Sequence, residues 1–176
     1  MNPRGATMKE ALIIIDVQND FCNGISGGKE VIKPLNRIIN FAKEKDWLIV
    51  ASRDWHLTGN HCIRNTEGAK FSSDLLIDKN TIIISKESYS AFNNEGESLN
   101  IILRENNVKN VYIGGLATDF CVRNTAIDSV KNGYNTYIIW DASKGVFKKK
   151  SENKIKEELK NGGVNLVFLK EIIKVV

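Results

Sequence analysis

Short runs of consecutive apolar residues recur along the chain, separated by longer stretches in which apolar and polar residues are mixed. The runs are rich in β-branched residues, which is typical of strands buried on both faces of a parallel sheet. They predict six strands, over residues 11–15, 47–51, 81–84, 111–113, 135–140 and 164–169.

The stretches between these runs predict helices. After Pro34, which can open a helix, apolar residues recur at helical spacing from Leu35 to Ala42. Strands that alternate with helices predict an α/β fold of three layers, in which a six-stranded, mostly parallel sheet carries helices on both faces. The further helices are expected over residues 98–106, 119–132 and 151–161.

Composition narrows the class of protein. With 176 residues, of which 42% are apolar and 26% charged, the chain has the make-up of one soluble globular domain. We expect residues 1–176 to form a single domain, with residues 1–8 as a loose tail. The net charge of +4 comes from scattered lysines without interleaved aromatic residues, so no nucleic-acid partner is expected. No stretch approaches a membrane span, so no membrane association is expected either.

The three cysteines form no CxxC pair; they are Cys22, Cys62 and Cys121. An odd number of cysteines in a chain without a recognisable signal peptide indicates reduced thiols and a cytoplasmic location. We expect Cys22 and Cys62 to pack in the interior.

The segment Gly114–Cys121 follows the fourth predicted strand and precedes a helix. Its two glycines are expected to turn the backbone tightly and to let it approach a ligand. Thr118 is well placed as an N-cap, so Cys121 lies in the first turn, where the positive end of the helix favours a thiolate. Cys121 is therefore either a nucleophile or a small apolar side chain packed in a first turn.

Four reactive side chains follow predicted strands, at the edge where parallel α/β sheets bind ligands. They are Asp16, Asp54, Lys86 and Cys121. Asp16 could serve as a base for the thiol, because burial would raise its pKa while Lys86 keeps it ionised. Taken singly, a loop-capping aspartate and a surface lysine are the simpler interpretations. Their convergence on one edge favours a catalytic site.

Asp54 also belongs to a second group, with the two histidines of the chain, His56 and His61. The group lies in a long irregular segment, residues 52–80, and loops of that length are usually functional. Two imidazoles and a carboxylate form a common ligand set for Zn²⁺, Fe²⁺ or Mn²⁺. We favour a divalent metal site, with zinc as the first choice, over solvent-facing loop residues.

Five segments carry a shared pattern in chain order: Asp16–Phe21, Ser52–His56, His61–Ala69, Tyr89–Phe92 after Lys86, and Gly114–Ala126. Together they resemble the isochorismatase-like cysteine hydrolase superfamily, and within it most the nicotinamidases. The resemblance implies the isochorismatase-like hydrolase fold and a catalytic triad of Asp16, Lys86 and Cys121. It also implies metal ligands at Asp54, His56 and His61, and a cis peptide bond between Leu116 and Ala117.

The reaction that this resemblance implies is the hydrolysis of a small amide, most closely that of nicotinamide to nicotinate and ammonia in NAD salvage. Cys121 attacks the carbonyl, Asp16 passes the thiol proton to the departing ammonia, and water cleaves the thioester. Backbone N–H groups of Ala117 and Cys121 would form the oxyanion hole, and the metal would anchor the pyridine nitrogen. A homo-oligomer is expected. The further residues expected beside the substrate are Leu116, Phe21, Tyr89, Phe92 and Phe120.

The sequence departs from the nicotinamidase pattern in the segment that carries the expected metal ligands, residues 52–80, which we call the metal loop. Only Leu57–Asn60 separates His56 from His61, and the Trp-Pro pair usual before the second histidine is missing. The aromatic wall for a pyridine ring is therefore absent from its usual place. A small carbamoyl, ureido or aliphatic amide stays an alternative substrate. A degenerate member that binds a metal or a ligand without catalysis is the remaining alternative.

Overall fold

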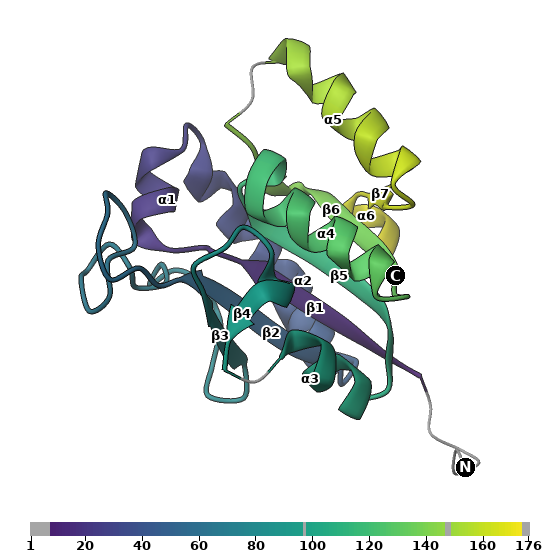
Figure 1. Ribbon diagram of the computed structural model, residues 1–176. Coiled ribbons are helices and arrows are strands. Elements are labelled where there is room, and N and C mark those ends of the chain that lie inside the picture. The colour runs from purple at the N-terminus through teal and green to yellow at the C-terminus, as the bar shows by residue number, and fades with distance from the viewer. Residues whose placement is uncertain (1–7, 97, 147–148, 174–176) are drawn as a thin grey trace.

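One sheet lies between two layers of helices in the computed structural model (Figure 1). The structure describes residues 8–96, 98–146 and 149–173, so residues 1–7 of the expected tail lie outside it. The strands follow the order β4-β3-β2-β1-β5-β6-β7. Their bounds are β1 (Lys9–Ile15), β2 (Leu48–Asp54), β3 (Ile82–Lys86), β4 (Asn94–Glu95), β5 (Val108–Leu116), β6 (Asn135–Lys144) and β7 (Asn165–Val167).

The six strands predicted from the apolar runs are confirmed, and all six pair in parallel. The seventh, β4, has two residues and pairs antiparallel with β3 at the edge of the sheet. A strand of two residues carries no hydrophobic run, which is why the sequence did not predict it.

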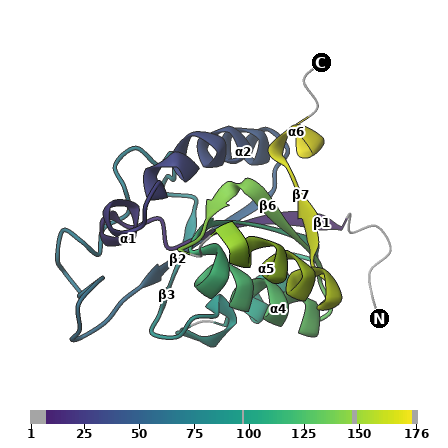
Figure 2. The ribbon, with the colours of Figure 1, turned by 90° about the horizontal axis from the view of Figure 1, so that it is seen from above.

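Helices cover both faces of the sheet. Figure 2 shows α2 and α6 on one face and α4 and α5 on the other. Alternate side chains of β1 supply both cores, because successive residues of a strand point to opposite faces. Leu12 and Ile14 pack with α2, whereas Ile13 and Ile15 pack with α3, α4 and α5. The helix bounds are α1 (Asn19–Gly24), α2 (Ile32–Glu44), α3 (Leu99–Glu105), α4 (Arg123–Lys131), α5 (Lys149–Asn161) and α6 (Leu169–Ile172).

The segment after β1 was expected to begin a polar loop, and instead it forms α1. Its polar side chains bond to another part of the chain rather than to solvent: Asn19 Nδ2 donates to the Glu67 carbonyl at 2.9 Å. This partner lies in the loop between β2 and β3, far from Asn19 in the sequence. The residues around Asn19 therefore could not predict the contact. Figures 1 and 2 show α1 and this loop together beyond the carboxyl ends of the central strands.

The two glycines expected to form a turn lie within β5, and this is a second correction. Gly115 has a φ of +124°, and a Cβ on it would lie 2.2 Å from the carbonyl oxygen of Ile15. Only glycine therefore lets β5 approach the end of β1. The glycine therefore allows a close contact with a neighbouring strand rather than with a ligand. The contact is made at Ile15, one residue before Asp16.

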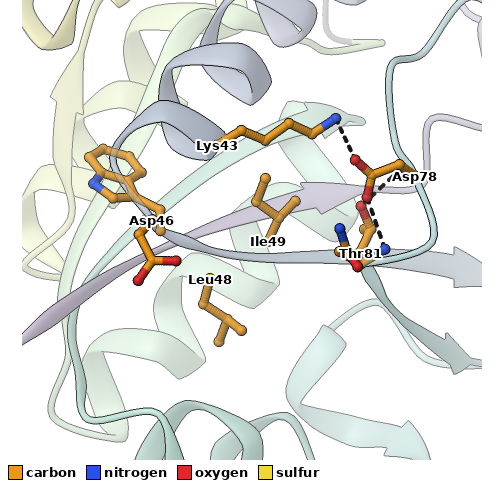
Figure 3. Close-up of a pocket in the computed structure, with 8 residues that line it drawn as sticks. Lys43, Asp46, Leu48, Ile49, Asp78 and Thr81 are labelled. Atoms are coloured by element: carbon orange, nitrogen blue, oxygen red, sulfur yellow. Dashed lines mark hydrogen bonds and ion pairs between the residues drawn. The ribbon is translucent and has the colours of Figure 1, made fainter.

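A hollow of about 410 Å³ lies at the amino-terminal start of β2, at the end of the sheet opposite to Asp16 (Figure 3). Lys43 of α2 and Asp78 face each other across it and form an ion pair of 2.8 Å. Both charges are thus already paired. Among the described residues, no helix has both the length and the apolar content to cross a bilayer.

Candidate active site

The four side chains expected at the carboxyl edge of the sheet do lie together there. Asp16 directly follows β1 and Lys86 ends β3; both side chains are fully buried. Lys86 Nζ lies 2.7 Å from Asp16 Oδ2 and 3.4 Å from Cys121 Sγ. Ser52 Oγ donates a hydrogen bond of 2.7 Å to Asp16 Oδ1. The carboxylate, the ammonium group and the sulfur therefore form one contact group, in which Asp16 Oδ1 is hydrogen-bonded to Ser52 and Oδ2 is ion-paired with Lys86.

Cys121 lies in a π-helical turn, Thr118–Val122, that joins β5 to α4. The carbonyl of Ala117 accepts two N–H groups of this turn, each at 3.1 Å. The N-cap is therefore Ala117, which makes no side-chain bond, and the prediction of Thr118 as the cap is wrong by one residue. The expected cis peptide bond between Leu116 and Ala117 is confirmed.

Burial shifts the pKa of each group in this cluster. It raises the pKa of Asp16, which Lys86 counteracts. It also raises the pKa of the Cys121 thiol, and the charge of Asp16 adds to that effect while Lys86 opposes it. Burial disfavours the charge of Lys86 as well, but Asp16, Cys121 and Asp54 together raise the pKa of Lys86. The first turn of the helix was expected to favour a thiolate, but burial and the charge of Asp16 shift the pKa of the Cys121 thiol in the opposite direction.

The candidate metal ligands also converge. Asp54 ends β2, and one donor atom from each of Asp54, His56 and His61 lies within 4.8 Å of the others. His56 Nε2 lies 3.6 Å from Asp54 Oδ2, and the two imidazole centroids are 5.3 Å apart. Two ring nitrogens and a carboxylate oxygen this close together fit a divalent cation such as Zn²⁺.

Asp54 connects the two centres, since its other oxygen, Oδ1, accepts a hydrogen bond from Lys86. Gln18 holds the backbone of Asp54 from both sides: Oε1 accepts the Asp54 N–H at 2.8 Å, and Nε2 donates to the Asp54 carbonyl at 2.9 Å. The sequence predicted no role for Gln18. A polar side chain two residues after Asp16 in a strand-end motif was the available signal, but its partners are distant in sequence and its burial shows only in the fold.

A cavity of about 270 Å³ opens beside the sulfur. Phe21, Tyr89 and Phe120 line it as expected, together with His61 and Ala117. The rings of Tyr89 and Phe120 are 5.7 Å apart, so they form one side of the opening.

Two residues expected beside the substrate lie elsewhere. Phe92 is partly buried against the core, with its ring 6.2 Å from that of Tyr134. Leu116 is fully buried in the core on the α2 face. Both are apolar residues close in sequence to site residues, and the direction of each side chain depends on the packing of the whole fold. Cys22 and Cys62 are buried and free, as expected.

Comparisons with known proteins show the family of this chain. The family model of the isochorismatase domain matches residues 10–167. The nicotinamidase/pyrazinamidase of Mycobacterium tuberculosis is 31% identical over 89% of this chain and 97% of its own. The nicotinamidase of Escherichia coli is 30% identical over 77% of this chain and 83% of its own. The crystal structure of the pyrazinamidase of Pyrococcus horikoshii in complex with zinc is 42% identical, covers 91% of this chain and 99% of its own, and has a TM-score of 0.82.

The chain belongs to the isochorismatase family. Within that family it is a hydrolase of amide carbon–nitrogen bonds, the class formed by these relatives.

Proposed function

We propose that this protein is a cysteine amidohydrolase that converts nicotinamide and water to nicotinate and ammonia, with Asp16, Lys86 and Cys121 as its catalytic residues. The observation that supports it most is the contact of one buried lysine with both the carboxylate and the sulfur, beside an apolar cavity. The similarity to nicotinamidases supports the choice of substrate.

The raised pKa values of Asp16 and the Cys121 thiol suggest the order of proton transfers in the reaction. Asp16 accepts the thiol proton as Cys121 Sγ bonds to the amide carbon, and the carbonyl oxygen becomes an oxyanion. The N–H groups of Ala117 and Cys121 are proposed to stabilise that charge. Asp16 then gives the proton to the leaving nitrogen, and ammonia departs from a thioester. Water, deprotonated by Asp16, releases the acid and restores the thiol.

The charge of Lys86 lowers the pKa of Asp16, against the effect of burial, and so favours the ionised form that accepts a proton. The rings of Phe21, Tyr89 and Phe120 give a planar substrate aromatic surfaces to pack against, and they stand in for the missing Trp-Pro wall. Asp54, His56 and His61 are proposed to hold a divalent metal, zinc first and iron or manganese otherwise, which would supply an anchor for a ring nitrogen.

A different small amide remains the second candidate substrate. The short loop after His56 leaves Leu57 71% exposed, and none of its four residues, all of which the structure describes, lines the cavity. A wider opening would admit a carbamoyl, ureido or aliphatic amide.

The test is ammonia release from nicotinamide, pyrazinamide, carbamoyl and ureido compounds. We expect nicotinamide to be among the best substrates, and chelation to lower turnover strongly. Cys121→Ala should lower turnover at least about a thousandfold, because it removes the nucleophile. Cys22→Ala, at another buried cysteine that does not line the cavity, is the matched control and should retain activity. Undiminished turnover by Cys121→Ala would rule out the thioester mechanism.

A further inference from the structure

The loop that carries His61 lies between the end of β2 and the start of β3, and along its described length it forms no helix or strand. His61 itself is exposed. The next residue, Cys62, has a φ of +48°, in the left-handed region that residues with a side chain adopt at a cost. A conformation of this kind persists where surrounding groups hold it.

Asp20 of α1 supplies such a group. Its Oδ2 accepts the Cys62 N–H at 2.7 Å, a hydrogen bond to a carboxylate and therefore a strong one. The carbonyl of Cys62 in turn accepts the N–H of His56 at 3.1 Å. Cys62 is thus joined to His61 along the chain and to His56 by a hydrogen bond. The position of its backbone sets the spacing of both imidazoles.

The same carboxylate also fixes the returning part of the loop. A Cβ on Gly68 would lie 2.2 Å from both carboxylate oxygens of Asp20, so a larger residue at position 68 would displace that carboxylate. The N–H of Asp20 donates to the Gly68 carbonyl at 3.0 Å. The neighbouring Asn19 N–H donates to the Lys70 carbonyl at 2.9 Å. These contacts bind α1 to the loop without using any of the metal-facing atoms.

We propose that Asp20 is a positioning residue that fixes His61 relative to Asp54 and His56, and that it thereby sets the affinity of the protein for a divalent metal. The inference rests on the proposed function, because it concerns the metal site assigned there. Phe21, the next residue in α1, has its ring 5.2 Å from that of His61. Asp20 therefore also keeps one wall of the cavity aligned with the metal loop.

The experiment measures zinc affinity of the metal-free protein by competition with a chromophoric chelator. Asp20→Ala should weaken zinc binding about ten- to a hundredfold, the range typical of residues that orient metal ligands. Asp20→Asn should restore most of the affinity, because its amide oxygen can still accept the Cys62 N–H. Asp78→Ala, which removes an ion pair at the opposite end of the sheet (Figure 3), is the matched control. It should bind zinc as the wild type does, whatever it does to thermal stability.

Gly68→Ala provides an independent steric test. In the wild-type background its Cβ should displace the Asp20 carboxylate and weaken zinc binding. In the Asp20→Ala background the space is free, so the same substitution should cost nothing further. Additive losses in the double variant would contradict the proposed contact.

If Asp20→Ala binds zinc with wild-type affinity, the inference is overturned. An equal loss of zinc affinity in Asp20→Ala, Asp20→Asn and Asp78→Ala also overturns it, because such a loss would reflect stability alone. Ammonia release separates this inference from the proposed function. A wild-type protein that hydrolyses amides without binding zinc overturns the present inference and the metal site assigned above, but leaves the proposed amide hydrolysis standing. One whose zinc affinity depends on Asp20 but which releases no ammonia from any amide overturns only the proposed function.

Discussion

The chemistry of Cys121 depends on what surrounds its sulfur more than on where it lies in a helix. The first turn of a helix favours a thiolate, and the sequence predicted one on that ground. Burial and the charge of Asp16 act in the opposite direction and raise the pKa of the thiol. In the proposed mechanism the reactivity of Cys121 comes from the adjacent carboxylate of Asp16, which takes the proton during attack.

Asp16→Asn should therefore have opposite effects on two measurements. Removing the charge of Asp16 removes one cause of the raised pKa of Cys121 and leaves Lys86 beside the sulfur. The pH profile of Cys121 alkylation by iodoacetamide should move to lower pH, while amide turnover falls because the proton acceptor is lost. Loss of the alkylation in Cys121→Ser would show that Cys121 is the labelled thiol. A profile that moves to higher pH would mean that Asp16 does not raise the pKa of this thiol.

The elements around the site are placed by contacts between strands. β1 and β5 lie side by side at the point where the order of the strands reverses, and the site lies beyond their carboxyl ends. Gly115 allows their close approach next to Asp16. The sequence showed the glycine pair but not its purpose, since a turn and a strand contact both require glycine.

Gly115→Ala should destabilise the fold by about 2–5 kcal/mol, because it adds a backbone clash with Ile15 to an unfavourable φ. Gly133→Ala is the matched control: Gly133 has a φ of +90°, but a Cβ on it would meet no other atom within 4 Å. Its cost should be only about 1–2 kcal/mol. Urea unfolding measures both, and equal losses would mean that the contact with Ile15 contributes nothing.

At the scale of the whole molecule, the site exists only because several crossovers return to one edge of the sheet. Asp54 and Lys86 end two parallel strands, and Asp16 and Cys121 follow two others. His61 comes from a loop that α1 holds in place. A bound metal would join β2 to that loop, so metal binding and global stability should be linked.

Zinc should therefore raise the melting temperature of the wild type. A ligand that binds only the folded state adds about 2.7 kcal/mol at a hundred times its dissociation constant. His61→Ala should lose most of this gain, because one of the three donors is gone. Calorimetry with and without zinc measures the difference. An equal rise in both proteins would place the bound zinc elsewhere.

The expected homo-oligomer and the cytoplasmic location stay predictions. Sedimentation tests the first of them against the monomer mass of 19.8 kDa. A single species at that mass would contradict it.

The sequence by itself determined the parallel sheet, its six main strands and the residue types at their carboxyl ends. These follow from local runs of apolar residues and from the rule that parallel strands end at one edge. Only the tertiary structure decided that Phe120 lines the cavity while Phe92 joins the core. It also decided that Gln18 bonds to the backbone of Asp54 and that Asp20 bonds to the backbone of Cys62. Each of these depends on partners distant in the chain, and hydrophobic periodicity carries no information about such pairs. The directions of the pKa shifts at Asp16, Lys86 and Cys121 were also decided only by the tertiary structure, because a pKa depends on burial and neighbouring charge.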